Sequence, residues 1–166
     1  PEQEKNYFVN AITTNLTSFF REQHHFDYLI QQELPKLISA KNTRRVDDIH
    51  RVGGKRLRIW SCATSTGEEP YSIAISLLEG MKKVINQWDV KILATDIDSN
   101  VLAQAKAGVY DQKRIEDIPA NYQKKYFHKG SGENEDKVKV DKSLQKLLTF
   151  KQLNLLHDWP MKGPFD

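Results

Sequence analysis

Apolar residues recur at helical spacing in two parts of the chain. After Glu68 they fall at i, i+3, i+4 and i+7, which places them on one helix face: Tyr71, Ala74, Ile75 and Leu78. Pro70 fits the first turn of this helix, where its missing N–H costs no hydrogen bond. A second helical pattern runs between residues 26 and 38, and Pro35 should kink or end it.

Short apolar runs on either side of the helix after Glu68 predict strands at residues 57–60 and 90–95. Ser99 is a suitable N-cap for a following helix, and Gly108 is a suitable end for it. The order strand, helix, strand, helix predicts a right-handed, parallel α/β unit.

The pattern changes in the last third of the chain. Residues 119–125 predict a short helix, and residues 126–129 and 137–140 predict an antiparallel hairpin around a Gly-Ser-Gly turn. Valines alternate with lysines in the second hairpin strand, so one face is apolar and the other basic. Residues 147–150 predict one more strand, and the polar residues 41–55 predict a connector.

The composition is typical of a water-soluble domain. Of 166 residues, 39% are hydrophobic and 28% charged, which suits one domain with a packed core. No apolar run approaches the roughly 20 residues that cross a bilayer, and residues 1–10 lack the zones of a signal peptide. Cys62 is the only cysteine, so we expect no internal disulfide and a cytoplasmic protein. The net charge of +3 favours an anionic partner, although a solvated basic surface is the simpler explanation.

A run of small residues separates the first predicted strand from its helix. Small side chains at residues 61–67 let a ligand approach the backbone closely, beside the N–H groups of the helix start. Glu68 and Glu69 begin that helix, and their charge would repel a pyrophosphate but attract an ammonium or sulfonium group. The glycine pattern of a dinucleotide site and the P-loop lysine are both absent. The loop therefore favours a cationic or zwitterionic ligand, unless the two acids only complement the helix dipole.

Asp96 ends the second predicted strand, where ligands bind in parallel α/β sheets. A carboxylate there can accept two hydrogen bonds from a ribose diol. Either Asp96 or Asp98 could instead cap the next helix, and Asp98 is the better placed of the two. A small-residue loop with a nearby strand-end acid favours a cofactor that contains adenosine.

Four sequence motifs follow one another along the chain: NLTSFFR at 15–21, WSCATSTGEEPYSIA at 60–74, ATDID at 94–98 and LNL at 153–155. Together they resemble the CheR family, the chemotaxis protein-glutamate O-methyltransferases, from about Asn15 to Asp166. The resemblance implies an α/β, Rossmann-like class I S-adenosylmethionine (SAM)-dependent methyltransferase fold. It implies an incomplete doubly wound sheet with a small antiparallel β-subdomain.

The domain organisation that the resemblance implies has two parts. Residues 1–56 would be an N-terminal segment and linker that contributes to the cofactor pocket. Residues 57–166 would be the first half of the SAM-binding methyltransferase domain, with the β-subdomain inserted at about 124–150. Members of the family continue beyond this point, so we expect residues 57–60 to form a bare apolar edge. Further chain, or another copy, would cover that edge in the natural protein.

The resemblance also implies SAM as the cofactor and a set of residues that bind it: Asn15, Thr17, Arg21, Glu68, Glu69, Asp96, Asn154 and Leu155. Arg21 is the candidate catalytic residue. A substrate glutamate is already ionised at neutral pH, so it needs no general base but does need alignment with the methyl group. The planar guanidinium of Arg21 could hold one carboxylate oxygen while the other attacks. Arg21 could alternatively form a surface ion pair with Glu22 or Asp27.

The partner that the resemblance implies is the cytoplasmic domain of chemoreceptors. Some members bind a receptor C-terminal peptide on the β-subdomain, which would add a strand to a sheet edge. Lys129 and Lys139 stand where those members carry arginines, and lysine lacks the bidentate grip on a carboxylate. An ordinary solvated hairpin is the alternative. We expect no bound nucleic acid, no membrane insertion and no metal, because the five histidines lack ligand spacing.

Other functions remain open from the sequence. A nucleic-acid methyltransferase would share the cofactor-binding half and the basic charge, although residues 15–21 argue against it. A non-catalytic SAM-binding regulatory domain would keep the fold without turnover. A nicotinamide oxidoreductase is disfavoured because its glycine pattern is missing.

Overall fold

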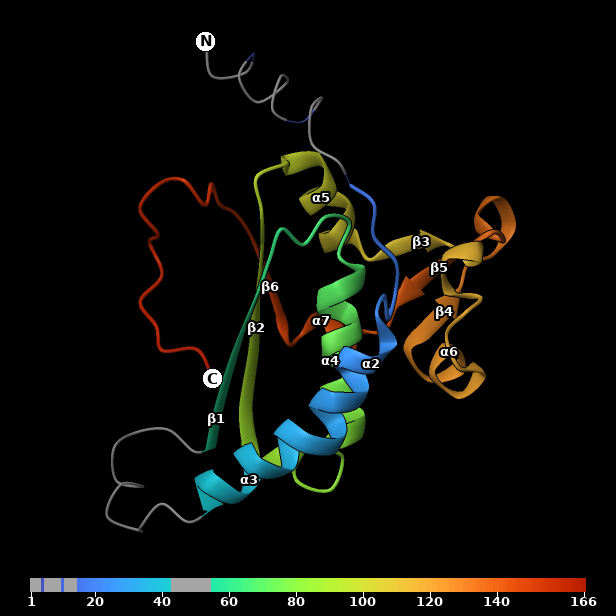
Figure 1. Ribbon diagram of the computed structural model, residues 1–166. Helices are drawn as coiled ribbons and strands as arrows, with labels where there is room; N and C mark the ends of the chain where they lie inside the picture. Colours follow the sequence, from blue (N-terminus) through green and yellow to red (C-terminus); the bar gives the residue numbers. More distant parts are fainter. Residues whose placement is uncertain (1–3, 5–9, 11–14, 43–54) are drawn as a thin grey trace.

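A computed structural model describes residues 4, 10, 15–42 and 55–166 of the chain. Its larger sheet has three parallel strands in the order β1-β2-β6: β1 (Lys55–Cys62), β2 (Trp88–Asp96) and β6 (Leu148–Gln152). The predicted parallel α/β unit is therefore confirmed (Figure 1). The connector expected at 41–55 lies mostly outside the described residues.

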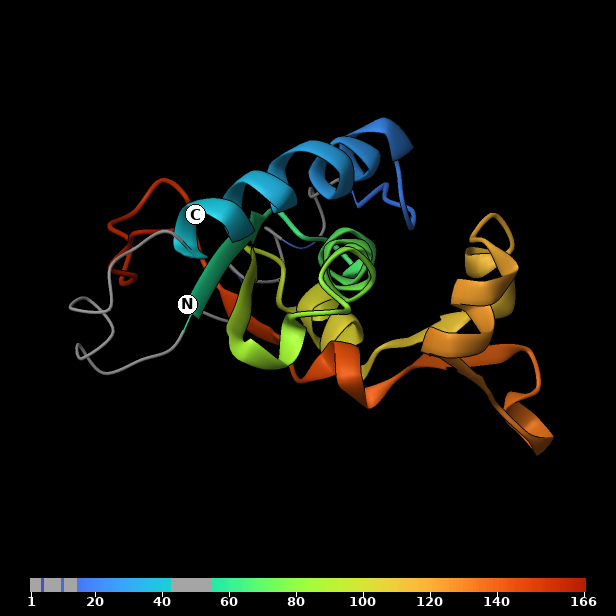
Figure 2. The same cartoon turned by 90° about the horizontal axis from the view of Figure 1, so that it is seen from below.

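Helix α4 (Glu68–Gly80) follows β1 and leads through a short 3-10 turn, η3 (Ile85–Gln87), into β2. Its predicted apolar face is confirmed, because Tyr71, Ala74 and Ile75 are fully buried. The helix lies between the parallel sheet and the N-terminal helices (Figures 1 and 2). It is therefore covered on two sides, which explains why eight of its residues are buried.

Helix α5 (Ser99–Ala107) follows β2. Asp98 is its N-cap, and the Asp98 carboxylate accepts hydrogen bonds from the N–H groups of Asn100 and Val101. The cap is therefore one residue earlier than the Ser99 that we predicted, and it agrees with the choice of Asp98 over Asp96. Gly108 ends the helix in a left-handed conformation with φ 63°, as predicted.

The N-terminal helical region has three segments: α2 (Gln23–Tyr28), a π-helical turn η1 (Leu29–Glu33) and α3 (Leu34–Asn42). The helix does not end at Pro35, which is the second residue of α3. Instead, the wider π turn ends at Glu33, two residues before Pro35, so the departure from regular α-helical geometry precedes the proline. Phe26 and Leu34 are buried, and the region covers α4.

A second, antiparallel sheet has the order β3-β5-β4, with β3 (Val109–Asp111), β4 (Phe127–Lys129) and β5 (Lys137–Val140). The predicted hairpin is confirmed, because β4 pairs with β5 and Phe127 lies opposite Val140. We did not predict β3, which pairs with the other side of β5. The antiparallel sheet therefore includes residues before 124, and β6 belongs to the parallel sheet.

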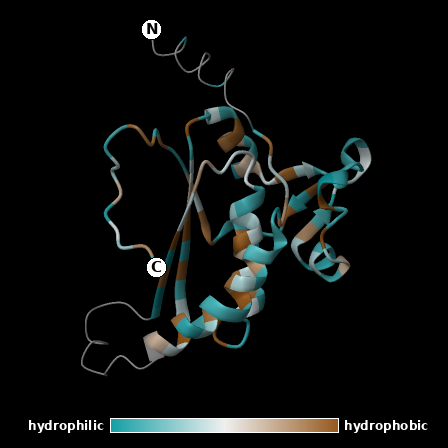
Figure 3. Ribbon diagram, in the orientation of Figure 1, coloured by the Kyte–Doolittle hydropathy of each residue, from teal (hydrophilic) through white to brown (hydrophobic). Residues whose placement is uncertain are grey.

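Short helical segments complete this half of the molecule: η4 (Gln112–Ile115), α6 (Ala120–Tyr126), η5 (Gly132–Asn134) and α7 (Lys142–Gln145). The subdomain projects to one side of the parallel sheet (Figure 2). Hydrophobic residues gather along α4 and the strands, whereas the outer turns are hydrophilic (Figure 3). The apolar faces of both halves contribute to a single core cluster.

Phe19 joins the N-terminal segment to this core. Its side chain is 7% exposed. The ring packs edge-on against Tyr110 and Phe127, with centroids 5.0 and 5.2 Å away. Tyr110 lies in β3 and Phe127 in β4, so Phe19 holds residues 15–21 against the antiparallel sheet.

The end of the chain lies along β1. The N–H of Asp166 donates to the Arg58 carbonyl at 2.8 Å, and the Arg58 N–H donates to the Asp166 carboxylate at 2.9 Å. The rings of Trp159 and Phe165 pack against Trp60. The edge of β1 is therefore not bare as we expected, because residues 159–166 cover part of it.

Candidate functional site

The loop between β1 and α4 turns sharply, with three residues in left-handed conformations. Ala63, Ser65 and Gly67 have φ values of 53°, 49° and 96°. A Cβ atom on Gly67 would lie 2.7 Å from the Ala105 Cβ, closer than real Cβ contacts come. Gly67 therefore meets two requirements at once: an unusual backbone angle and close packing against α5.

Asp96, at the end of β2, holds this loop in place. Its carboxylate accepts a hydrogen bond from the Ser65 N–H at 2.7 Å and another from the Asp98 N–H at 3.0 Å. The Asp96 carbonyl accepts from the Leu153 N–H at 2.9 Å, just after β6. The carboxyl ends of all three parallel strands therefore meet around Asp96, the position where such sheets bind ligands.

The two acids that begin α4 have different surroundings. Glu68 is fully buried; its carboxylate pairs with Arg114 and accepts a hydrogen bond from the Thr66 hydroxyl at 2.6 Å. Glu69 is exposed, and its carboxylate accepts from the Ser61 hydroxyl at 2.8 Å. Of the two acids, only Glu69 has a carboxylate that a ligand could reach, because Glu68 is buried and paired with Arg114.

The N-terminal segment forms the other wall of the site. The Phe20 N–H donates to the Ser72 hydroxyl at 2.9 Å, which attaches the turn at residues 18–21 to α4. The Arg21 guanidinium donates to the Leu16 carbonyl at 3.1 Å, so the side chain lies back along its own segment. The carbonyl of Asn15 accepts from the Ser65 hydroxyl at 3.3 Å, and this contact joins the two walls.

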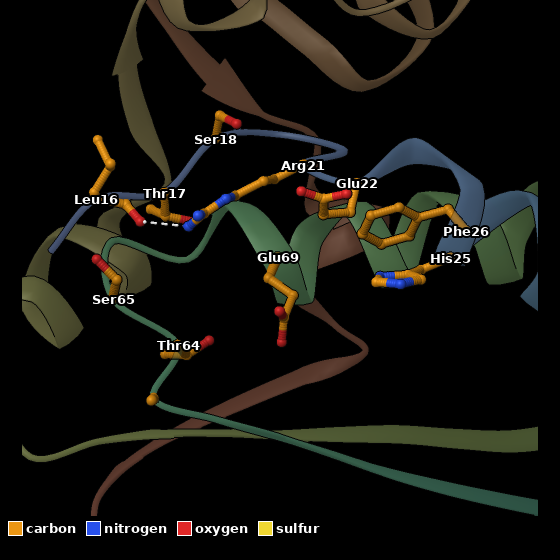
Figure 4. Close-up of a pocket in the computed structure, with 11 residues that line it drawn as sticks. Leu16, Thr17, Ser18, Arg21, Glu22, His25, Phe26, Thr64, Ser65 and Glu69 are labelled. Atoms are coloured by element: carbon orange, nitrogen blue, oxygen red, sulfur yellow. Dashed lines mark hydrogen bonds between the residues drawn. The ribbon is translucent and has the colours of Figure 1, made fainter.

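Between these walls lies a pocket of about 320 Å³, near the lower end of the usual range for ligand sites. Figure 4 shows the Glu69 carboxylate extending toward Thr64, with Arg21 on the segment above it. The pocket thus has the Glu69 carboxylate on one wall, and the Arg21 guanidinium together with the Glu22 carboxylate on the other. Its lining residues are Leu16, Thr17, Ser18, Arg21, Glu22, His25, Phe26, Ala63, Thr64, Ser65 and Glu69.

Thr17, Arg21 and Glu69 are the predicted site residues that line this pocket. Asn15 and Asp96 lie directly behind it, since both bond to Ser65. Asn154 and Leu155 follow the Leu153 contact to Asp96, so they border the same strand ends outside the pocket lining. The Asn154 carboxamide oxygen accepts from the Leu156 N–H at 2.9 Å, and Leu155 is 44% exposed. Glu68 is the one predicted ligand with no exposed surface.

Three residues at or near the site were not among the predicted site residues. His25 lines the pocket four residues after Arg21, and only its position after the NLTSFFR motif could have drawn attention to it. Arg114 pairs with Glu68. The Tyr110 hydroxyl donates to the Thr66 carbonyl at 2.7 Å, and burial, with the nearby Glu68 charge, raises the pKa of Tyr110. Tyr110 therefore stays a neutral donor that supports the loop.

The two lysines considered for peptide binding lie in the antiparallel sheet. Lys129 ends β4 opposite Val138, whereas Lys139 lies opposite His128. Because neighbouring residues of a strand point to opposite faces, the register puts Lys129 and Lys139 on different faces of the sheet. The two side chains do not form a single basic patch.

Within residues 15–42 and 55–166, no helix is long and apolar enough to cross a membrane. The same described part of the chain holds no group of three or more His, Cys, Asp or Glu residues that could bind a metal ion.

Similarity to known proteins agrees with this geometry. Residues 15–166 match the family model described as CheR methyltransferase, SAM binding domain. The chain is 47% identical to chemotaxis protein methyltransferase 2 of Pseudomonas aeruginosa, over 98% of this chain and 53% of that protein. It is 43% identical to a probable chemotaxis protein methyltransferase of Rhizobium etli, over 95% of this chain and 55% of that protein.

A third relative is the chemotaxis protein methyltransferase of Salmonella typhimurium, 40% identical over 96% of this chain and 49% of that protein. The chain spans about half the length of the curated relatives it matches. Because the family model matches nearly all of the chain, this protein belongs to the CheR methyltransferase family, in the region of its SAM-binding domain.

Proposed function

We propose that the protein transfers a methyl group from SAM to glutamate side chains of chemoreceptors in the cytoplasm, forming methyl esters. The observation that carries the proposal is the placement of Glu69 and Arg21 on separate walls of one pocket at the strand ends. The Glu69 carboxylate suits the positive end of the cofactor, and the Arg21 guanidinium suits an anionic substrate. Relatives named as chemotaxis methyltransferases support the same function.

The residues present fit SAM. Glu69 would hold the ammonium group of the methionine end, since its charge is exposed in the pocket. Asp96 would hold the ribose; each of its oxygens accepts one backbone hydrogen bond and has a second acceptor position. Asn154 and Leu155 would border the adenine, and Asn15 and Thr17 would complete the pocket beside the Ser65 turn.

When bound, SAM supplies an electrophilic methyl carbon on a sulfonium. The protein has to align a glutamate carboxylate with that carbon and keep water away from it. Arg21 would hold one carboxylate oxygen through its guanidinium and leave the other free to form the ester bond. No side chain has to remove a proton, because the glutamate is already ionised at neutral pH.

The cofactor half of the proposal is tested by titrating the complete protein with S-adenosylhomocysteine and, separately, with NAD, and measuring heat and melting temperature. We expect saturable binding of the first ligand only. Binding of NAD alone would favour a nicotinamide oxidoreductase. Binding of neither ligand would contradict the proposed site.

The substrate half is tested by incubating the protein with methyl-labelled SAM and membranes that carry chemoreceptors, or with tRNA or DNA. We expect base-labile label in the receptors only, because glutamate methyl esters hydrolyse in base. Label in nucleic acid would identify a nucleic-acid methyltransferase. Cofactor binding without label in any acceptor would favour a non-catalytic regulatory domain.

Attachment to a receptor tail is a second proposal, supported by the position of β4 at an edge of the antiparallel sheet within the described residues. A peptide could pair with β4, and exposed Lys129 would lie beside it. Lys139, in the central strand, would contact the peptide only from the opposite face. Tethering predicts that Lys129→Glu weakens binding of the receptor tail, whereas Lys139→Glu has a smaller effect.

A further inference from the structure

Arg114 connects two parts of the pocket wall that are far apart in the sequence. One nitrogen of its guanidinium, Nη2, pairs with the buried carboxylate of Glu68 at the start of α4. The same nitrogen donates to the Thr17 carbonyl at 3.0 Å. Thr17 lines the pocket, and Glu68 is next to Glu69, which also lines it. A single cationic group therefore bridges the two walls from behind.

The chemistry of Glu68 makes this bridge demanding. A carboxylate with no exposed surface has lost its hydration, and its burial costs free energy that a close cationic partner must offset. Arg114 supplies the charge, and the Thr66 hydroxyl supplies a hydrogen bond at 2.6 Å. The remaining Nη2 hydrogen is directed to the backbone of the N-terminal segment, so the position of that segment depends on the same guanidinium.

The bridge starts from the antiparallel sheet. Arg114 lies in η4, directly after β3, and its side chain is 41% exposed. Tyr110 in β3 also reaches the loop, through its hydrogen bond to the Thr66 carbonyl. The antiparallel sheet and the turn after β3 thus support both the loop between β1 and α4 and the N-terminal wall of the pocket.

We propose that Arg114 is a positioning residue that holds the Thr17 wall of the pocket against the Glu68 turn and so sets the geometry in which the cofactor binds. The proposal rests on the proposed function, because its test uses S-adenosylhomocysteine as the ligand. Arg114 is not among the residues that line the pocket. Its effect passes through the Thr17 backbone and the Glu68 carboxylate.

The test must separate positioning from stability, since Arg114→Gln alone leaves a buried charge without a partner. The double variant Glu68→Gln with Arg114→Gln removes both charges, so it should regain most of the lost melting temperature. It still lacks a guanidinium at the Thr17 carbonyl. Lys113→Gln is the matched control, because Lys113 is exposed on the same turn and belongs to neither contact.

Two quantities are measured on the complete protein: the dissociation constant for S-adenosylhomocysteine and the amide hydrogen exchange of residues 18–21 without ligand. We expect both R114Q and the double variant to bind about tenfold or more weakly, as for a lost hydrogen bond to a charged group. Both should also exchange faster at residues 18–21. K113Q should match the unaltered protein in both quantities.

A double variant that recovers affinity together with melting temperature would overturn the proposal, because Arg114 would then act through stability alone. So would unchanged hydrogen exchange at residues 18–21 in that variant. If the unaltered protein does not bind S-adenosylhomocysteine, the proposed function fails. The exchange measurement still decides whether Arg114 holds the wall, since it needs no ligand.

Discussion

The carboxylate of Asp96 accepts a hydrogen bond from the backbone N–H of Ser65 at 2.7 Å, across 31 residues of sequence. The acid at the end of β2 is therefore also a structural support for the loop after β1. Replacing Asp96 should therefore affect both ligand binding and folding.

Asp96→Asn should lower the free energy of unfolding by about 1–3 kcal/mol, because one of the two backbone N–H groups then faces an amide NH₂ and loses its acceptor. Binding of S-adenosylhomocysteine should weaken as well. Urea unfolding and calorimetric titration measure the two effects, and Asp158→Asn, at an exposed position, is the control. A D96N protein with unaltered stability would contradict the supporting role of Asp96.

Glu69→Gln should separate charge from shape. Glutamine keeps an oxygen that can accept from the Ser61 hydroxyl, so stability should change by less than about 0.5 kcal/mol. Loss of the charge should weaken S-adenosylhomocysteine binding about tenfold or more, as expected for a hydrogen bond to a charged group. Methylthioadenosine lacks the ammonium group and should bind both proteins equally. Equal weakening for both ligands would show that Glu69 does not hold the ammonium.

Arg21→Ala should reduce methyl transfer far more than it reduces cofactor binding. Arg21 lines the pocket, and we propose that it holds the substrate carboxylate. The rate at saturating receptor should fall by about a hundredfold, in the range for loss of a charge-stabilising donor, while the affinity for S-adenosylhomocysteine changes little. Initial rates and calorimetry give the two numbers. An unchanged rate at saturating substrate would remove Arg21 from this role.

The elements that the sequence predicted well have strong local patterns. In α4 the spacing of Tyr71, Ala74 and Ile75 indicates the buried face, and all three are inaccessible to solvent. The parallel strands could be predicted because a helix long enough to cross back lies between them. The strand-end position of Asp96 followed from that order.

The parts that were missed depend on contacts between distant residues. Strand β3 has three residues, too few to show a period, and it forms only because β5 offers an edge. Arg114 and Glu68 are 46 residues apart, so no local pattern links them. The different roles of Glu68 and Glu69 follow from that pairing, and the sequence alone could not separate two adjacent acids.

His25→Ala should lower kcat/KM for receptor methylation severalfold, and His24→Ala should not. The two histidines are adjacent and both are exposed, yet only His25 lines the pocket. The pair therefore provides a matched control for surface charge and helix propensity. Initial rates at low receptor concentration test the difference. Equal effects of the two substitutions would exclude a specific role for His25.

The stability of the β-subdomain should depend on acid through Asp141. Hydrogen bonds from the Ser143 hydroxyl, from His128 and from the Ser143 N–H lower the pKa of Asp141 from 3.8 to about 2. A depressed pKa in the folded state means that the carboxylate stabilises the protein above pH 3.8, and that this contribution is lost as the pH falls toward about 2.

Asp141→Asn keeps a side-chain oxygen for the cap of α7 and removes the charge. At pH 7 the variant should be less stable by at most about 1 kcal/mol, the usual limit for a partly exposed pair. The difference from the unaltered protein should shrink between pH 4 and pH 2. Urea unfolding at pH 7, 4 and 2.5 measures this trend. A stability difference between the two proteins that stays constant over this range would mean that the ionisation of Asp141 contributes nothing. Asp141 would then act only as a helix cap.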